Sequence, residues 1–244
     1  MHNHFNHSLT GQSSFYDKIS CIYYINLPER IDRKQHILTL LTQYFPDKKI
    51  TRMKAISSKN LEQYKQFYDT RLLDDYRYFN TKKELVIPGI IGCFLSHFFL
   101  LKKIQYSLQK QNDGDHFFLV FEDDTCFDSE LIDKLKILEE YLPHDWTVIF
   151  GLNPESKIFE NQEQYSYNKY LCKIDNARAP FAFGNNLLIY NPKKINLLVE
   201  QMENSLHIWD YDMMLLYYNT GLYCFKKGVI SVSELSYQSD LRIT

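Results

Sequence analysis

Three consecutive acids, Glu122, Asp123 and Asp124, are the residues of this sequence best suited to do chemistry. They follow the unbroken apolar run 117–121, which is typical of a strand buried on both faces. Acids at the carboxyl end of such a strand lie where open α/β sheets bind their ligands. Adjacent carboxylates repel one another, and Mg²⁺ or Mn²⁺, which prefer oxygen ligands and bridge to phosphates, would neutralise them. The alternative is an ordinary strand-to-loop junction whose acids are solvated or cap a helix.

Composition sets broad limits on the class of protein. The chain has 244 residues, a net charge of −2, 45% hydrophobic and 24% charged residues. This length fits one large α/β domain, or a domain with a modest insertion, and we expect the domain over residues 18–244. The polar, His/Asn-rich residues 1–17 are expected to form a flexible lead-in. Nothing in the charge points to nucleic acid as a partner. The aromatic share of 16% is high enough to include stacking platforms for a base or a sugar as well as core.

The cysteines and the apolar segments bear on location. The five cysteines are scattered and odd in number, which favours reduced thiols and a cytoplasmic protein over a disulfide framework or a zinc motif: Cys21, Cys93, Cys126, Cys172 and Cys224. The longest apolar run, residues 87–101, is too short to span a bilayer, and the polar amino terminus does not resemble a signal peptide. Peripheral membrane association stays open.

The first strand and helix form the opening unit of a nucleotide-binding fold. A β-branched and aromatic strand over residues 19–27 is followed by a helix whose apolar face spans residues 37–45. The Gly-rich dinucleotide fingerprint is absent. Arg30 and Arg33 lie between strand and helix and could supply positive charge to a diphosphate, or could mark a solvated basic helix start.

The remaining pattern predicts further strands and helices. The apolar run from Pro88 to Leu101, which ends at Lys102 and Lys103, suits a buried helix in which Ser96 and His97 are the polar exceptions. A buried His is more often a satisfied core residue than a ligand. The other expected elements, in chain order, are a weak strand at 50–56, irregular surface structure over 57–86, a helix at 130–142 capped by Asp128 or Ser129, a strand at 145–151, a surface loop or small hairpin over 152–178, a strand at 181–190, helices at 191–202 and 208–218, and a strand at 229–232.

Four blocks of this sequence resemble glycosyltransferase family 25, which includes lipooligosaccharide and collagen galactosyltransferases. The blocks span residues 21–240 and are Asn26-Leu27 followed by Arg30 and Arg33, Gly92-Cys93 followed by Ser96-His97, the triplet Glu122-Asp123-Asp124, and a late acidic segment with Asp210, Asp212 and Ser239-Asp240. The late segment departs from the family's usual pattern, in which one Asp follows a small apolar pair.

The resemblance implies a transferase of the GT-A type with a Rossmann-like, mixed and mostly parallel sheet. It implies UDP-galactose as donor, Mn²⁺ as metal and inversion at the transferred sugar. Asp124, with Glu122, becomes the expected metal ligand, and Glu122 or Asp123 would hold the ribose or assist the metal. The other expected donor contacts are Asn26, Leu27, Arg30, Arg33, Ser96 and His97.

Inversion also requires a carboxylate base near the acceptor hydroxyl. The resemblance favours Asp212 over Asp210, with Asp240 next in line. Acids near a helix start are more often caps. The acceptor would be a hydroxyl group of a glycan, a glycolipid or a protein.

Two rival functions remain. One is a degenerate family member that binds a sugar nucleotide or a protein partner without turnover. The other is a metal-dependent phosphatase or nucleotidyltransferase built on the same acidic strand end.

Overall fold

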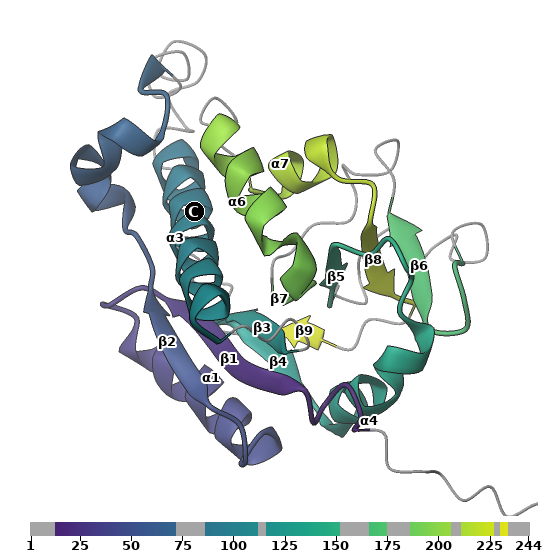
Figure 1. Ribbon diagram of the computed structural model, residues 1–244. Coiled ribbons are helices and arrows are strands. Elements are labelled where there is room, and N and C mark those ends of the chain that lie inside the picture. Colours follow the sequence, from purple (N-terminus) through teal and green to yellow (C-terminus); the bar gives the residue numbers. More distant parts are fainter. Residues whose placement is uncertain are drawn as a thin grey trace, which may run out of the picture.

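The computed structural model describes residues 13–71, 86–111, 116–151, 166–174, 186–205, 211–226 and 230–233. Its centre is a seven-stranded sheet with the order β2-β1-β3-β7-β5-β8-β6 (Figure 1). The strands are β1 (Ile19–Asn26), β2 (Ile50–Lys54), β3 (Phe117–Glu122), β5 (Val148–Phe150), β6 (Leu171–Ile174), β7 (Leu187–Tyr190) and β8 (Leu222–Phe225). A separate two-stranded sheet pairs β4 (Thr125–Phe127) with β9 (Ile230–Val232).

The large sheet is mixed and mostly parallel. Strands β2, β1 and β3 are parallel neighbours, and β5 and β8 are parallel to each other. Strand β7 is antiparallel to both β3 and β5, and β6 is antiparallel to β8. Five of the seven strands therefore point the same way, and the expected GT-A-type sheet is confirmed.

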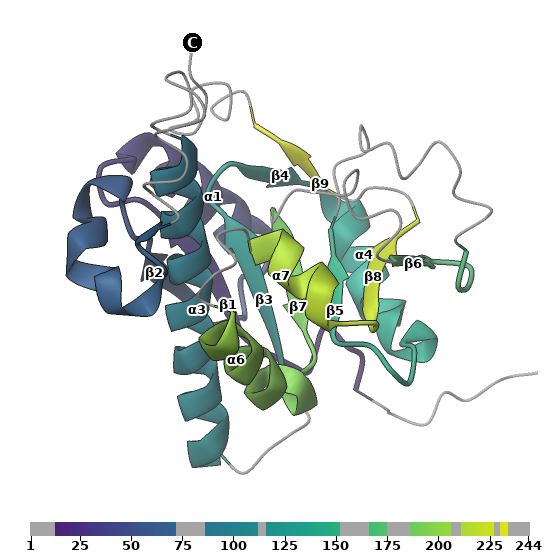
Figure 2. The same cartoon turned by 90° about the horizontal axis from the view of Figure 1, so that it is seen from above.

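Helices cover both faces of the sheet (Figures 1 and 2). One face packs against α3 (Val86–Gln111), α6 (Ile195–Asn204) and α7 (Tyr211–Tyr218). The other face packs against α1 (Ile31–Tyr44) and α4 (Ser129–Ile137). Short 3₁₀ segments complete the described elements: η1 (Ser58–Phe67), η2 (Leu138–Tyr141) and η5 (Pro192–Lys194). No helix in the described parts of the chain combines the length and apolar character needed to cross a bilayer.

Strand β3 shows how the sequence builds two cores at once. Successive side chains of a strand point to opposite faces. Phe118 and Val120 accordingly lie in the core beneath α3, and Phe117, Leu119 and Phe121 lie in the core beneath α1 and α4. All five side chains are buried, which explains why the run reads as continuously apolar.

The segment that follows β2 packs closely against helix α3. The Ser96 hydroxyl accepts a hydrogen bond from the Ile56 backbone N–H (2.8 Å) and donates one to the Gly92 carbonyl (2.6 Å). One turn earlier on the same helix face, a Cβ on Gly92 would lie 2.4 Å from the Ile56 carbonyl oxygen. Glycine at 92 and serine at 96 thus set the depth at which α3 docks.

Replacing Gly92 with Ala should lower the free energy of unfolding by about 1–3 kcal/mol, the usual cost of overpacking. The obstacle is backbone and cannot rotate aside, so the gain in helix propensity, about 1 kcal/mol, does not compensate. Urea denaturation measures the change. Gln109→Ala on the exposed side of the same helix is the control and should stay within about 0.5 kcal/mol. A Gly92→Ala protein as stable as the parent would contradict this account of the docking.

Several expectations need correction. For the segment 152–178, expected to be a surface loop or a small hairpin, the surface-loop alternative is wrong at 171–174, because these residues form β6, an edge strand of the main sheet with buried Leu171 and Ile174. Cys172 of this strand also forms an antiparallel bridge with Ser166, as in a small hairpin. The helix expected over 130–142 ends at 137 and continues as η2, while Asp128 is its cap, accepting from the Glu130 N–H (2.8 Å). Strands β4 and β8 were not expected.

The packed structure also begins earlier than the expected boundary at residue 18. Within the predicted lead-in, residues 13–17 are described, and Phe15 is fully buried. Its ring stacks on that of Phe117 with centroids 4.0 Å apart. The rest of the lead-in lies outside the described residues.

Candidate active site

The acidic triplet lies at the carboxyl end of β3, beside the end of β1. In the parallel register Ile25 pairs with Glu122, so the next residues along the two strands, Asn26 and Asp123, lie side by side. The alternation seen along β3 continues into the acids. Glu122 lies on the α3 side, near Cys93, whereas Asp123 contacts Arg33 of α1. The three carboxylates therefore divide between two faces of the sheet.

Asp123 is buried and fully engaged. Its Oδ2 accepts a hydrogen bond from Asn26 Nδ2 (2.6 Å), and its Oδ1 accepts one from the Arg33 guanidinium (3.2 Å). Burial raises the pKa of the Asp123 carboxyl, and the contacts with Asn26 and Arg33 oppose that rise. Both oxygens are used within the protein, so this residue orients its neighbours.

Asp124 is held from three directions. Its Oδ1 accepts from Asn186 Nδ2 (3.2 Å), and its Oδ2 lies 3.5 Å from the Arg33 guanidinium. Its backbone carbonyl accepts from the Ser233 N–H (2.8 Å), where the small β4–β9 sheet closes over the turn. Asp124 keeps some solvent exposure, which leaves its carboxylate accessible to a ligand.

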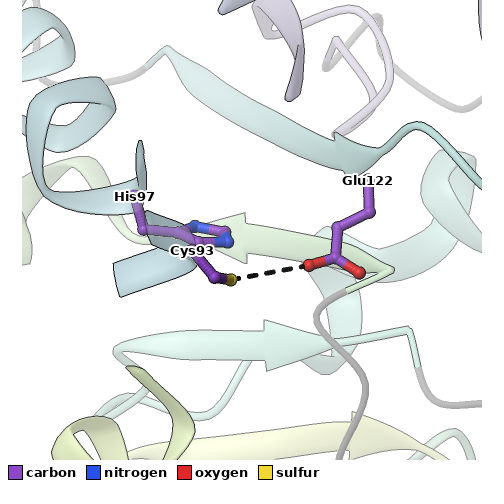
Figure 3. Close-up of side chains that lie close together, drawn as sticks. All are labelled: Cys93, His97 and Glu122. Carbon is purple, nitrogen blue, oxygen red and sulfur yellow. Dashed lines mark hydrogen bonds between the residues drawn. The ribbon is translucent and has the colours of Figure 1, made fainter. Parts of the chain in front are cut away.

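Glu122 belongs to a separate cluster with two side chains of α3 (Figure 3). The Cys93 thiol donates to Glu122 Oε1 over 3.9 Å. One ligand atom from each of Cys93, His97 and Glu122 lies within 4.8 Å of the other two. Cys93 and His97 are four residues apart and so share one helix face. The Gly92-Cys93/Ser96-His97 block thus encodes two adjacent faces, one that docks the helix and one that faces the acids.

His97 is deeply buried, and its ring stacks on Tyr211 with centroids 4.3 Å apart and planes inclined by 8°. The Tyr211 hydroxyl in turn shares a hydrogen bond with that of Tyr190 (2.7 Å). Neither imidazole nitrogen has a hydrogen-bond partner among the described residues. Burial lowers the pKa of His97 to about 3, so the ring is neutral near pH 7.

The buried imidazole should make stability depend on pH. Below about 6.5 the unfolded chain binds a proton at His97 that the folded chain binds only near pH 3. The free energy of unfolding should therefore decrease as the pH is lowered from about 6.5 to about 3, by up to about 1.4 kcal/mol for each pH unit. Urea denaturation in chelator-containing buffer measures this slope. His97→Phe, which keeps a ring against Tyr211, should show a shallower slope, and equal slopes in both proteins would contradict the prediction.

The other expected donor contacts are placed as follows. Arg30 forms an ion pair with Asp32 (2.8 Å), and the Leu27 carbonyl accepts from the Arg30 N–H and from Arg52. The Asn26 Oδ1 atom is buried without a hydrogen-bond partner in the described part of the chain. The Ser96 hydroxyl makes the two hydrogen bonds to backbone groups that dock α3.

The expected bases are less fully placed. Asp212 lies in the first turn of α7, directly after Tyr211, whose stacking on His97 fixes that end of the helix beside the acidic cluster. Tyr211 and Leu215 are buried, as the helical spacing predicts. Asp210, Asp240 and Ile208 lie outside the described residues.

The donor set suits a divalent cation. The Arg33 guanidinium, which pairs with Asp123 and Asp124, offsets part of the negative charge of the triplet. Glu122 and Asp124 are each partly exposed, whereas both oxygens of Asp123 are occupied. The carboxylate oxygens of Glu122 and Asp124 match the oxygen chemistry of Mn²⁺ or Mg²⁺.

Sequence reasoning did not single out Asn186 or the ligand potential of Cys93. Cys93 was recognisable, because it lies four residues before His97 on a helix. Asn186 gave no local signal, since it reaches Asp124 from 62 residues away as β7 begins.

Comparisons with known proteins identify the family of this chain. The family model of glycosyltransferase family 25 (LPS biosynthesis protein) matches residues 19–193, more than two thirds of the chain. Procollagen galactosyltransferase 2 of Mus musculus is 33% identical over 133 residues, which are 53% of this chain and 20% of that protein. The chain thus spans about a fifth of the length of that relative.

Similar solved structures are more distant. A glycosyltransferase involved in glycosylation of the major capsid of PBCV-1 has a TM-score of 0.42 at 9% identity, over 82% of this chain and 74% of its own. The galactosyltransferase LgtC, in complex with donor and acceptor sugar analogs, has a TM-score of 0.38 at 13% identity, over 83% and 72%. The family match covers the Asn-Leu/Arg, Gly-Cys/Ser-His and Glu-Asp-Asp blocks, and the chain belongs to glycosyltransferase family 25.

Proposed function

We propose that this glycosyltransferase moves galactose from UDP-galactose to a hydroxyl group of an acceptor, with a divalent cation and with inversion. The observation that supports this best is the held but accessible carboxylate of Asp124, beside Glu122, at the ligand-binding edge of the sheet. The galactose donor is proposed from a curated relative, named as a procollagen galactosyltransferase. The cysteines are scattered and their total is odd, which supports a cytoplasmic location.

Each residue of the site has a proposed task. Glu122 and Asp124 would hold the Mn²⁺ or Mg²⁺ ion, which when bound stabilises negative charge on the departing diphosphate. Asn186 and Arg33 keep Asp124 in position, and Asn26 holds Asp123 so that it in turn fixes Arg33. We propose that the free Asn26 Oδ1 receives a donor hydroxyl, and that Arg30 reaches the diphosphate.

The acceptor side is proposed to be built by α7. Its first turn carries Asp212 and is anchored by Tyr211 against His97, close to Glu122. Asp212 would take the acceptor proton as the new glycosidic bond forms and the bond to UDP breaks, with Asp210 and then Asp240 as the other candidates. A positioned carboxylate base contributes about 10²–10⁴-fold to the rate.

Release of UDP tests the function directly. The protein is incubated with UDP-galactose, UDP-glucose or UDP-N-acetylglucosamine, with Mn²⁺ or with EDTA, and UDP is measured with and without hydroxyl-bearing acceptors. Metal-dependent release that is fastest with UDP-galactose supports the proposal. Slow donor hydrolysis without acceptor also supports a transferase. Donor binding without turnover would instead identify a degenerate sugar-nucleotide-binding protein.

A further inference from the structure

The cluster of Cys93, His97 and Glu122 has the composition and spacing of a metal site. Among the described residues, these three side chains could hold a metal ion together, because one ligand atom from each lies within 4.8 Å of the others. Two of the ligands stand one turn apart on α3, a rigid helix, and the third comes from the end of β3 (Figure 3). In a tetrahedral zinc site with bond lengths of about 2.0–2.3 Å, neighbouring ligand atoms are roughly 3.3–3.8 Å apart. Shifts of about 1 Å in the ligand atoms, which side-chain rotation can supply, would bring them to the spacing of a zinc site.

The state of His97 is an independent sign of a missing ligand. The ring is 1% exposed, and neither nitrogen has a hydrogen-bond partner in the described structure. Buried polar groups without partners cost free energy, and each one in a native protein calls for an explanation. Stacking on Tyr211 holds the ring beside Cys93 and Glu122. A bound cation would give one of these nitrogens its partner.

The chemistry of the three ligands selects the ion. A thiolate, an imidazole and a carboxylate form a nitrogen–sulfur–oxygen set that suits Zn²⁺, whereas Mg²⁺ and Mn²⁺ favour oxygen alone. Binding would release the Cys93 thiol proton to solvent, and the thiolate and the Glu122 carboxylate would together neutralise the two charges of the ion. That balance matters, because an unpaired charge so close to the core would be costly.

We propose that Cys93, His97 and Glu122 form a zinc site with an open fourth position, which shares Glu122 with the all-oxygen site at Asp124. This inference goes beyond the proposed function and does not depend on it. Glu122 is common to both sites, so a zinc ion bound here would draw that carboxylate toward α3.

Cobalt is the spectroscopic probe for the test. The 244-residue protein is titrated with Co²⁺ in the absence of sugar nucleotide. The thiolate-to-cobalt charge-transfer band in the near ultraviolet is recorded together with the visible d–d bands. We expect one equivalent of Co²⁺ to produce both, with d–d intensities typical of four-coordinate geometry, and Zn²⁺ to abolish them. Failure of sugar transfer would leave this result unchanged.

Matched variants locate the ligands. Cys93→Ser should abolish the charge-transfer band, whereas Cys126→Ser should keep it, although Cys126 also lies beside a histidine, 3.5 Å from His36 Nε2. Both His97→Gln and Glu122→Gln should weaken binding at least ~10-fold and still show the band at saturation, which tests these two ligands independently of the Cys93 variant. The amino-terminal histidines His2, His4 and His7 offer nitrogen only and give no thiolate band. No band at millimolar Co²⁺, or a band that survives Cys93→Ser, would overturn the proposal.

Discussion

Replacing Asp124 with Asn should lower the rate of sugar transfer at least ~100-fold while the protein stays folded. The amide is a poor ligand for a divalent cation, and loss of a metal–phosphate contact removes several kcal/mol of transition-state stabilisation. The site tolerates the change structurally, because Asp124 keeps some exposure and its backbone carbonyl still accepts from Ser233. Steady-state UDP release with saturating Mn²⁺ measures the loss.

A control variant shows whether the loss of activity is specific to Asp124 or follows from removing any carboxylate. Asp133→Asn removes a carboxylate from the exposed surface of α4, where it pairs with Lys136 at 3.7 Å, and should leave the rate unchanged. Thermal denaturation of both variants checks folding. Parental turnover in Asp124→Asn, or full activity in excess EDTA, would remove Asp124 and its metal from the mechanism.

Replacing Arg33 with Ala should destabilise the protein by about 3–5 kcal/mol, the usual cost of removing one partner of a buried ion pair. The Arg33 and Asp123 side chains are each 9% exposed, and Asp124 lies on the same guanidinium. Without Arg33, the Asp123 carboxylate is left buried with only Asn26 as a donor among the contacts described above. Urea denaturation at pH 7 measures the change.

The origin of that loss can be tested in the same series. Adding Asp123→Asn to Arg33→Ala should recover part of the stability, because the unpaired buried charge disappears with it. Arg71→Ala is the matched control, since Arg71 pairs with Asp69 on the surface and should cost no more than about 1 kcal/mol. Additive effects in the double variant would show that Arg33 and Asp123 are not coupled.

The fold could be predicted from sequence wherever the local pattern was strong. The apolar run of β3, the helical apolar face of α1 and the nearly all-apolar start of α3 correspond to elements whose side chains are buried. Strands β4, β6 and β8 were missed, and with three or four residues each they are too short to establish a period. Strands β5, β7 and β9 are as short, but they lie in or beside runs of apolar and β-branched residues that the sequence shows. The pairing of the three missed strands depends on partners that lie far away in the chain.

The site could be predicted in its residue types but not in its pairings. Arg33 was expected to serve a diphosphate, and the structure shows it buried against Asp123, 90 residues away. Ser96 was expected to line the donor pocket, and it also holds α3 in place through the Ile56 N–H. Such partners are set by the register of parallel strands and the depth of helix packing, which no local window contains. Whether these residues also touch the donor stays a prediction.

The place of β7 in the sheet has a consequence for synthesis. This strand hydrogen-bonds to β3 on one side and to β5 on the other, yet it follows both in the chain. The second neighbour of β5 is β8, which emerges later still. A nascent chain that ends before residue 187 can therefore assemble β2, β1 and β3, but it leaves β3 as an open edge and β5 with no neighbour in the sheet. The last quarter of the chain unites the two halves, and Asn186, which holds Asp124, arrives at that same step.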